Sequence, residues 1–322
     1  MIYDAIIVGG GPAGLSAALV LGRCGRRVLV CDSGRYRNQC SHAMHGYLTR
    51  DGLPPEELLR IAREELIPYG VEYRKTVVTG ARTEGGGFHL VLDTGEELAA
   101  RKLLLATGVK DRLPEIAGIT EFYGQSIHHC PYCDGWEWRD RPAAVYGTGQ
   151  HGYALALSLL TWTCDIVLVT GGPSGLDEGQ ARDLEAFGIP VREELIARVE
   201  GSDGRLEQIV FASGEVLPRR ALFFSTGQEQ HCELAEKLGC AFNDKGTVET
   251  AEEERTNVPG LFVAGDASRD VQFVIVAAAE GAKAAVAINE ELQEENRRAM
   301  LEAATKKRTT APRISAESAA HP

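Results

Sequence analysis

Two cysteines separated by two residues, Cys130 and Cys133, are followed directly by Asp134. Thiols at this spacing can close into a small disulfide ring, so the pair can take up or release two electrons by thiol–disulfide exchange. A carboxylate beside the pair can accept or return the proton that a thiol loses or gains. The segment therefore predicts a catalytic dithiol with Asp134 as its acid and base.

A cysteine pair at this spacing can also form half of a zinc site, which then needs two further ligands. The sequence holds no second pair of this kind. His128 and His129 precede the cysteines, but adjacent residues of an extended chain point in opposite directions. No metal is therefore expected. Either histidine could instead stabilise a thiolate, and the sequence leaves their roles open.

A glycine-rich turn occupies residues 9–14, between a predicted strand at 5–8 and a predicted helix at 13–21. The first glycine allows the tight bend, the second lets the backbone approach a pyrophosphate, and the third lets the helix pack on the strand. The helix N-terminus then faces the anion. Asp32 ends the next predicted strand, about 20 residues beyond the second glycine, where a carboxylate can bind ribose hydroxyls. The residues assigned to this FAD or NAD site are Gly9, Gly11, Pro12, Ala13, Gly14 and Asp32.

A second unit of the same kind begins with a predicted strand at 143–146, turns through glycines at 147–152 and returns as a strand at 165–169. Strand, helix and strand in this order are typical of a doubly wound parallel sheet. We therefore predict an α/β chain with two nucleotide-binding, Rossmann-like domains. A glycine turn that packs a helix against a strand is also useful without a ligand, so the second turn by itself does not establish a second nucleotide site.

Length and charge narrow the function classes. The 322 residues exceed what one hydrophobic core usually spans. The net charge of -12 disfavours nucleic acid and anionic membranes as partners. The chain starts with a strand, not with a targeting segment, and no apolar run reaches membrane-spanning length. A cytoplasmic location is expected, where such a cysteine pair is more often catalytic or metal-binding than a structural disulfide.

The end of the chain reads as a helix at 271–294 followed by polar sequence. The residues that its periodicity places on the inward stripe are Ala278, Ala282, Ala285 and Ile288. Acidic residues between 290 and 295 are expected to be solvated. Beyond residue 304 the polar composition predicts a disordered tail.

Together these motifs resemble the low-molecular-weight thioredoxin reductase family of FAD flavoproteins, over nearly the whole chain from Tyr3 to about Leu292. The segments that carry the resemblance are residues 9–14, 106–108, 130–135, 147–152 and 260–266. The resemblance implies that the second domain is inserted into the first. The expected domains are residues 1–112 plus 248–304 for FAD, residues 113–247 for the inserted domain with the cysteine pair, and the tail at 305–322.

The resemblance also implies roles for particular residues. Cys133 is the thiol nearer the flavin, and Cys130 exchanges with the substrate. FAD contacts come from both ends of the chain. The additional FAD residues expected are Gly108, Gly265, Asp266 and Gln272. The substrate would be a thioredoxin-like protein or a small-molecule disulfide or dithiol, and the chain would be a homodimer.

One segment departs from the family. After the strand at 165–169 the chain reads Thr170, Gly171, Gly172, where the family usually has a His-Arg-Arg stretch that holds the 2′-phosphate of NADPH. Without that charge-assisted clamp the affinity for NADPH should fall steeply. The departure resembles the branch that takes electrons from ferredoxin or passes dithiol electrons to oxygen. We therefore expect a FAD-dependent thiol–disulfide oxidoreductase that works without NADPH.

Two alternatives stay open. A conventional NADPH-dependent thioredoxin-disulfide reductase could use an atypical phosphate site, with Arg182 or another remote arginine. A non-catalytic flavin redox-sensing module would need no special residues. The direction of the reaction also stays open, because electron flow depends on the potentials of the partners and not on the thiols alone.

Overall fold

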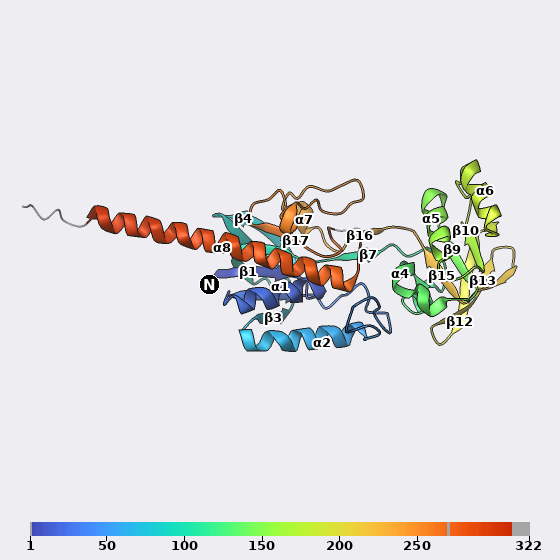
Figure 1. Cartoon of the computed structure of the whole chain (residues 1–322), viewed down its shortest axis with the longest axis horizontal. Helices are drawn as coiled ribbons and strands as arrows, with labels where there is room; N and C mark the ends of the chain where they lie inside the picture. The colour runs from blue at the N-terminus through green and yellow to red at the C-terminus, as the bar shows by residue number, and fades with distance from the viewer. Residues whose placement is uncertain (1, 269–270, 311–322) are drawn as a thin grey trace, which may run out of the picture.

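Two α/β units follow one another along the length of the molecule (Figure 1). The computed structural model describes residues 2–268 and 271–310, with side chains to residue 306. The first unit holds a seven-stranded sheet and the second a five-stranded sheet. In both, a glycine turn leads from a parallel strand into a helix. The predicted α/β fold with two Rossmann-like units is confirmed.

The sheet of the first unit has the order β3-β2-β1-β6-β5-β4, with β17 also paired to β6. Its strands are β1 (Ile2–Val8), β2 (Val28–Asp32), β3 (Glu72–Lys75), β4 (Val78–Glu84), β5 (Gly87–Leu92), β6 (Glu97–Leu105) and β17 (Leu261–Val263). The first half of β6 pairs antiparallel with β5, and its second half pairs parallel with β17. Strand β2 is buried along its whole length, as expected for a parallel strand covered on both faces.

Helices α1 (Pro12–Arg23) and α8 (Val274–Thr310) pack closely against each other. A Cβ atom at Gly281 of α8 would lie 1.9 Å from the carbonyl oxygen of Ala13, so the two backbones touch. Helix α8 runs well beyond the predicted end at residue 294. Residues 305–310, expected in the disordered tail, are therefore helical, and the remainder of that tail, residues 311–322, lies outside the described residues.

The contact at Gly281 decides which side of α8 faces the core. Ala285 and Ile288 are fully buried as predicted, whereas Ala278 and Ala282 are only half-buried. The buried stripe instead follows the turn above and below Gly281. Its buried apolar members are Ala277, Ala284, Ala285, Ala287, Ile288 and Leu292.

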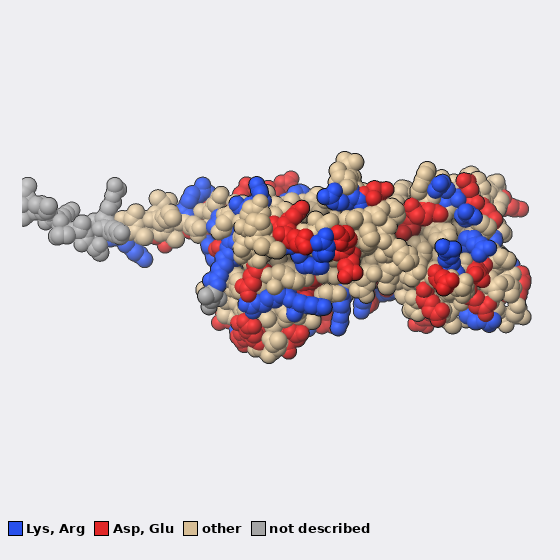
Figure 2. Space-filling model, turned by 90° about the horizontal axis from the view of Figure 1, so that it is seen from below, with Lys and Arg blue, Asp and Glu red and all other residues tan. Residues whose placement is uncertain are grey.

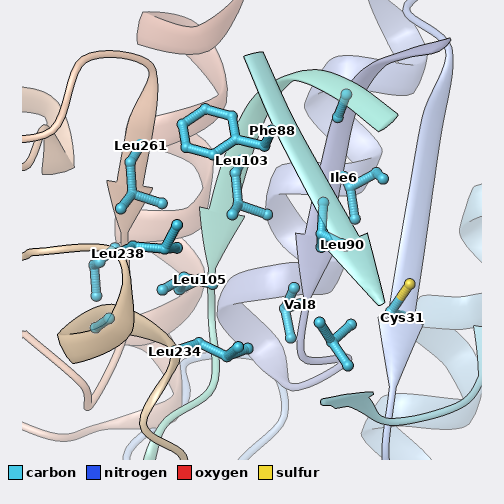
Figure 3. Close-up of a cluster of buried hydrophobic side chains, with 14 of the residues drawn as sticks. Ile6, Val8, Cys31, Phe88, Leu90, Leu103, Leu105, Leu234, Leu238 and Leu261 are labelled. Carbon is cyan, nitrogen blue, oxygen red and sulfur yellow. The ribbon is translucent and has the colours of Figure 1, made fainter. Parts of the chain in front are cut away.

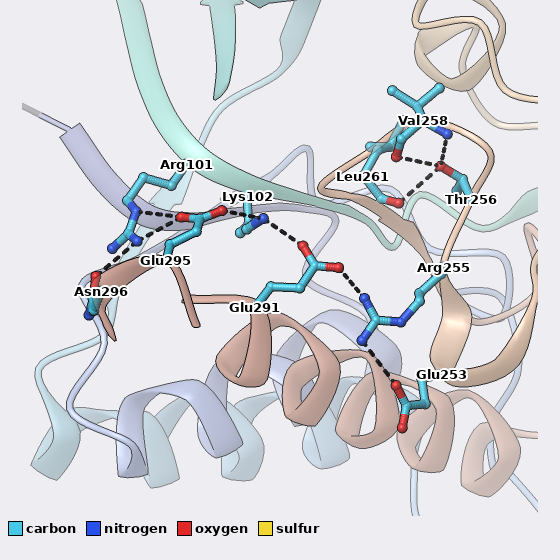
Figure 4. Close-up of polar contacts among 10 residues, drawn as sticks. All are labelled: Arg101, Lys102, Glu253, Arg255, Thr256, Val258, Leu261, Glu291, Glu295 and Asn296. Carbon is cyan, nitrogen blue, oxygen red and sulfur yellow. Dashed lines mark hydrogen bonds and ion pairs between the residues drawn. The ribbon is translucent and has the colours of Figure 1, made fainter. Parts of the chain in front are cut away.

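Acidic residues near the end of this stripe are not simply solvated, so that expectation is wrong for Glu291 and Glu295. Both contact the ammonium group of Lys102, at 2.5 Å and 2.8 Å (Figure 4). Lys102 lies on the central strand β6, and its side chain is only 8% exposed. A buried charge requires a partner, and these two carboxylates supply it. Glu291 also pairs with Arg255, and Glu295 with Arg101.

The sheet of the second unit has the order β11-β10-β9-β15-β8, with parallel pairing throughout. Its strands are β8 (Ile127–His128), β9 (Ala143–Tyr146), β10 (Ile166–Val169), β11 (Val191–Arg192) and β15 (Ala221–Phe224). A separate antiparallel sheet contains β12 (Ile196–Ser202), β13 (Arg205–Phe211) and β14 (Val216–Pro218). The helices of this unit are α3 (Ile119–Phe122), α4 (Pro131–Asp134), η2 (Gly135–Trp138), α5 (Gly149–Leu159) and α6 (Glu178–Ala186).

The chain crosses between the units at β7 (Val109–Asp111) and returns at β16 (Gln228–Gln230), and these two strands form an antiparallel ribbon. After the return, α7 (Leu234–Lys237) packs on the first sheet. Leu234 and Leu238 lie in the same core as Val8 and Leu105 (Figure 3). On this packing we propose that the first domain resumes near residue 231, and not at 248.

The remaining helices, α2 (Pro55–Leu66), η1 (Ile67–Tyr69) and η3 (Glu252–Glu254), belong to the first unit. Figure 2 shows basic and acidic side chains interspersed over one face of both units. Within the described part of the chain, no helix combines the length and the apolar composition that a bilayer-spanning segment needs.

The contact between α1 and α8 gives a first prediction. We expect Gly281→Ala to lower the free energy of unfolding by about 1–3 kcal/mol, because the added methyl group must push two backbones apart. Helix propensity alone would make alanine more stable than glycine here, by up to about 1 kcal/mol. A net loss of unfolding free energy therefore reports the steric effect. Thermal and urea unfolding measure it. Glu290→Ala, at an exposed position of α8, is the control, and equal stability of the two variants would contradict the prediction.

Candidate functional site

A cavity of about 290 Å³ is lined by residues of both units. It lies at the carboxyl ends of the parallel strands β1, β2, β6 and β17, where sheets of this type bind their ligands. Most of the predicted site residues form its wall. They are Gly9, Gly11, Pro12, Ala13, Asp32, Gly108, Cys133, Asp134, Gly265, Asp266 and Gln272. Gly14 and Cys130 do not line it.

The glycines of the first turn serve different purposes. A Cβ atom at Gly9 would lie 2.2 Å from the carbonyl oxygen of Ala106, and one at Gly14 would lie 1.9 Å from that of Gly9. Both glycines are therefore required by the fold itself. Gly11 has an ordinary φ of -77°, and nothing lies within 4 Å of its Cβ position. Its missing side chain leaves open space in the cavity wall, as a ligand that approaches the backbone requires.

Two unsatisfied polar features fit an anionic dinucleotide in this space. Helix α1 starts after Gly11 without a side-chain cap, so its first N–H groups remain available to an anion. His231 directly follows the returning strand β16. Its Nδ1 is buried in the cavity wall without a hydrogen-bond partner among the described residues. Buried polar atoms of this kind normally have a partner. The residues present therefore fit the cofactor that the glycine turn predicts.

Asp32 is held rigidly at the end of β2, with only 2% of its surface exposed. Its carboxylate accepts hydrogen bonds from the hydroxyl groups of Tyr36 and Tyr73 and from the backbone N–H of Gly34, the last at 3.1 Å. Burial and the hydrogen bond to Asp32 raise the pKa of both tyrosines. Both hydroxyl groups therefore stay protonated as donors and orient the carboxylate.

Arg37 connects four segments at one end of the cavity. Its guanidinium group donates two hydrogen bonds to Asp111, at 2.6 Å and 3.0 Å, and one to Asp266 at 2.9 Å. Further bonds reach the side-chain oxygens of Gln272 at 2.5 Å and Gln228 at 3.3 Å. The partners come from both strands of the connecting ribbon and from the segment that follows β17. One cation thus ties the crossovers to the last part of the first unit.

The charges of this cluster are unequally compensated. Burial acts to raise the pKa of Asp111, but the surrounding groups, above all the hydrogen bonds and charge of Arg37 and then the hydroxyl of Tyr123, together hold that pKa below its usual range. Asp266 shares the same cation, yet burial dominates there and raises its pKa. Burial beside Arg37 also lowers the pKa of His129 to about 4. The carboxylate of Asp111, 3.5 Å from its Nδ1, acts in the opposite direction but does not offset burial and Arg37, so the lowered pKa favours the neutral ring at physiological pH.

Cys130 and Cys133 form a disulfide with a Cα–Cα distance of 5.3 Å. Cys130 caps the short helix α4, and the backbone N–H of Cys133 donates to its sulfur at 3.1 Å. Only Cys133 faces the cavity. The geometry thus separates an inner sulfur, Cys133, from an outer one, Cys130.

The two histidines before the disulfide do point apart. His128 is buried, and its Nδ1 lies 3.3 Å from the carboxylate of Asp134. Its Nε2 accepts a hydrogen bond of 3.0 Å from the indole N–H of Trp138. His129 instead faces Asp111. The His128 ring therefore belongs to the surroundings of the disulfide, and the His129 ring belongs to the Arg37 cluster.

The second glycine turn is closed by the chain itself. The N–H of Gly149, the first residue of α5, donates to the carbonyl oxygen of Ser174 at 2.7 Å. The N–H of Ser174 in turn donates to the carboxylate of Glu193 at 2.8 Å. Arg192, the cation at the neighbouring strand end, is bound to Glu194 and Glu215. Arg182 lies exposed on α6.

Sequence reasoning missed Arg37, Asp111, Tyr36, Tyr73 and His231 as site residues. Asp111 and His231 could have been suspected, because each follows closely on a buried strand and a glycine at the carboxyl edge of its sheet. Arg37 and the two tyrosines carry no local signal. The partners of Arg37 and Tyr73 are distant in sequence, and Tyr36, although only four residues from Asp32, bonds it through a loop conformation that only the folded chain shows.

The open space at Gly11 gives a second prediction. Gly11→Val should lower the flavin content of the purified protein, since the branched side chain fills the space next to the helix N-terminus. The backbone at residue 11 is extended and accommodates valine, so the free energy of unfolding of the flavin-free chain should not change. Flavin-to-protein absorbance ratios and circular dichroism measure the two effects. Gly14→Ala is the contrast, because it should destabilise the chain itself, and full flavin content in Gly11→Val would refute the assignment.

The lowered pKa of His129 gives a third prediction. Between its folded value of about 4 and an unfolded value of about 6.5 the unfolded chain binds more protons, so stability falls as the pH falls through this range. We expect His129→Gln to lose less of its melting temperature between pH 7 and pH 5 than the parent. His151→Gln, at an exposed position, should behave like the parent. A parallel decrease in all three proteins would contradict this.

Comparison with known proteins agrees with this geometry. A probable thioredoxin reductase of Arthroderma benhamiae is 33% identical over 93% of this chain and 82% of its own length. A putative thioredoxin reductase from Bacillus anthracis, TrxB, superposes with a TM-score of 0.87 at 33% identity, over 91% of this chain and 99% of that one. The structure of HlmI superposes with a TM-score of 0.91 at 35% identity, over 96% and 98%. Residues 3–281 match the model of the pyridine nucleotide-disulphide oxidoreductase family, and the chain therefore belongs to that family as a flavin-dependent, thioredoxin reductase-like disulfide oxidoreductase.

Proposed function

We propose that this protein exchanges two electrons between FAD and an external thiol or disulfide through Cys130 and Cys133, and that NADPH is not the other partner. The observation that carries the proposal is the shared cavity, in whose wall Cys133 and Asp134 lie together with Gly11 and the start of α1. The bound flavin would supply a two-electron acceptor or donor beside the inner sulfur.

The outer and inner sulfurs divide the exchange between them. A substrate thiolate attacks Sγ of Cys130, the Cys130–Cys133 bond breaks, and Cys133 leaves as a thiolate. A second substrate thiol then attacks the mixed disulfide and releases Cys130, so the substrate loses two electrons and the cysteine pair gains them. Asp134 accepts the proton that the attacking thiol loses. The same steps in reverse reduce a disulfide, because the direction depends on the partners' potentials.

The roles of the other predicted residues follow from where they lie. We assign the pyrophosphate to the turn from Gly9 to Gly14, and the ribose hydroxyls to Asp32. The remaining FAD contacts would come from the far side of the cavity. Those assigned to it are Gly108, Gly265, Asp266 and Gln272. The substrate is a thioredoxin-like protein or a small-molecule dithiol or disulfide, with the chain acting as a homodimer.

The closed second turn supports the proposal that NADPH is not used. A pyrophosphate at α5 would need the N–H of Gly149, which Ser174 already engages. The strand end that should clamp the 2′-phosphate carries Thr170 and two glycines, and the neighbouring Arg192 is already paired with two carboxylates. Electrons would then enter or leave through the thiols and a ferredoxin-type donor or oxygen.

A second candidate is a conventional NADPH-dependent thioredoxin reductase. The names of relatives such as the probable thioredoxin reductase of Arthroderma benhamiae favour it. It would require the loop at Ser174 to open and a cation such as the exposed Arg182 to reach the phosphate.

An anaerobic titration separates the two candidates. Dithiothreitol should bleach the flavin absorbance of the purified protein, whereas NADPH and NADH should not, because the second turn is closed. Cys130→Ser and Cys133→Ser should retain FAD but lose dithiol-driven bleaching. Cys164→Ser, which removes an exposed cysteine outside the disulfide, should behave like the parent. Prompt bleaching by NADPH would establish the second candidate, and bleaching by dithiol in the double cysteine variant would refute both.

A further inference from the structure

Both ring nitrogens of His128 are engaged, and by groups of different character. The ring is buried at the end of β8, 4% exposed, and lies against Phe223 with ring centroids 5.4 Å apart. The indole N–H of Trp138 donates to Nε2 at 3.0 Å. The carboxylate of Asp134 faces Nδ1 at 3.3 Å. The imidazole is therefore fixed between a neutral donor and an acceptor.

These two contacts assign the tautomer. An indole nitrogen can only donate a hydrogen bond, so Nε2 of His128 must be the unprotonated nitrogen that accepts it. The proton of a neutral imidazole then resides on Nδ1, which faces Asp134. Protonation of Nε2 would make both nitrogens donors and would break the bond to Trp138.

We propose that Trp138 is a positioning residue that holds His128 in the Nδ1–H tautomer, so that the histidine orients the Asp134 carboxylate and does not itself carry the proton. This inference rests on the proposed function, in which Asp134 accepts the proton of the attacking thiol. It assigns a task to a tryptophan that does not itself line the cavity but contacts His128, which does.

The local fold holds the indole in this place. Trp138 ends the short helix η2, which follows α4 directly, so the chain turns back over β8 only four residues after Asp134. Gly135 starts η2 so close to Trp162 that a Cβ atom there would lie 2.7 Å from its ring. Trp138 also packs on the core of the second unit. The donor is thus anchored independently of the histidine that it contacts.

Few charged groups surround the imidazole. Asp134 faces it from α4, and His129 follows it on the same segment. On the far side of His129 lie Asp111 of β7 and Arg37 of the first unit. The carboxylate of Asp134 is therefore the charged group in contact with His128 among the described residues. A change in the protonation of His128 would act first on Asp134.

The test is the pH dependence of flavin bleaching by dithiothreitol in the holoenzyme. Trp138→Phe retains an aromatic ring but removes the donor, so Nε2 loses its hydrogen bond and becomes free to accept a proton. An imidazolium beside Asp134 makes the carboxylate a weaker base. We expect the rate of the variant, relative to the parent, to fall about fivefold from pH 8 to pH 5, while its FAD content stays the same.

His128→Asn is the matched variant, because its amide can still donate to Asp134 but cannot titrate. We expect it to lack the added ionisation and to retain more activity than Asp134→Asn. Adding Trp138→Phe to His128→Asn should change nothing further, since Trp138 acts through His128. The proposal is overturned if Trp138→Phe has the parent's pH profile, if the double variant shows the added ionisation, or if His128→Asn is as inactive as Asp134→Asn.

A spectroscopic measurement separates this inference from the proposed function. In the holoenzyme labelled with ¹⁵N-histidine, the signal lost in His128→Asn identifies the ring, and its nitrogen shifts report the tautomer. The Nδ1–H form is expected in the parent, with loss of that preference in Trp138→Phe. An Nε2–H form in the parent would overturn the inference. If dithiols fail to bleach the flavin, the proposed function fails, and the nitrogen shifts still decide the role of Trp138.

Discussion

The site depends on one buried cation. Arg37 comes from the segment after β2, yet its partners lie on both strands of the connecting ribbon and after β17. Those segments meet only in the folded chain. Without the guanidinium group, Asp111 and Asp266 would face each other as unpaired, poorly solvated carboxylates, a much costlier arrangement than the paired one. The position of the disulfide relative to the first unit therefore depends on charge compensation in addition to hydrophobic packing.

Parallel strands explain why the remaining chemistry gathers in the same place. The strands β1, β2, β6 and β17 all end at one edge of the sheet, so the residues that follow them share that edge. The inserted unit adds α4 from the other side, with Cys133 and Asp134 reaching the same cavity. The two units thus each contribute what the other lacks, a cradle for an anionic dinucleotide and a pair of exchangeable sulfurs.

The sequence was informative wherever the signal was local. The glycine turn from Gly9 to Gly14 and the cysteine pair can be recognised because each needs fixed residue types at fixed spacing. Contacts between residues far apart in the chain could not be predicted from the sequence. The packing of α7 on the first sheet, the pairing of Lys102 with Glu291, and the partners of Arg37 all join residues far apart in the chain. The polar composition after residue 304 suggested disorder, but charged residues at helical spacing, such as Glu294 and Arg298, also favour continued helix.

The ribbon of β7 and β16 has a mechanical consequence. Asp111 and Gln228 are register partners on its two strands, and both bind Arg37. A rotation of one unit against the other would have to twist this ribbon. The guanidinium group of Arg37 would resist the twist, because it binds Asp111 on one strand and Gln228 on the other. The hydrogen bonds to Arg37 therefore add to the backbone pairing of the ribbon, and a rotation that separated Asp111 from Gln228 would break them.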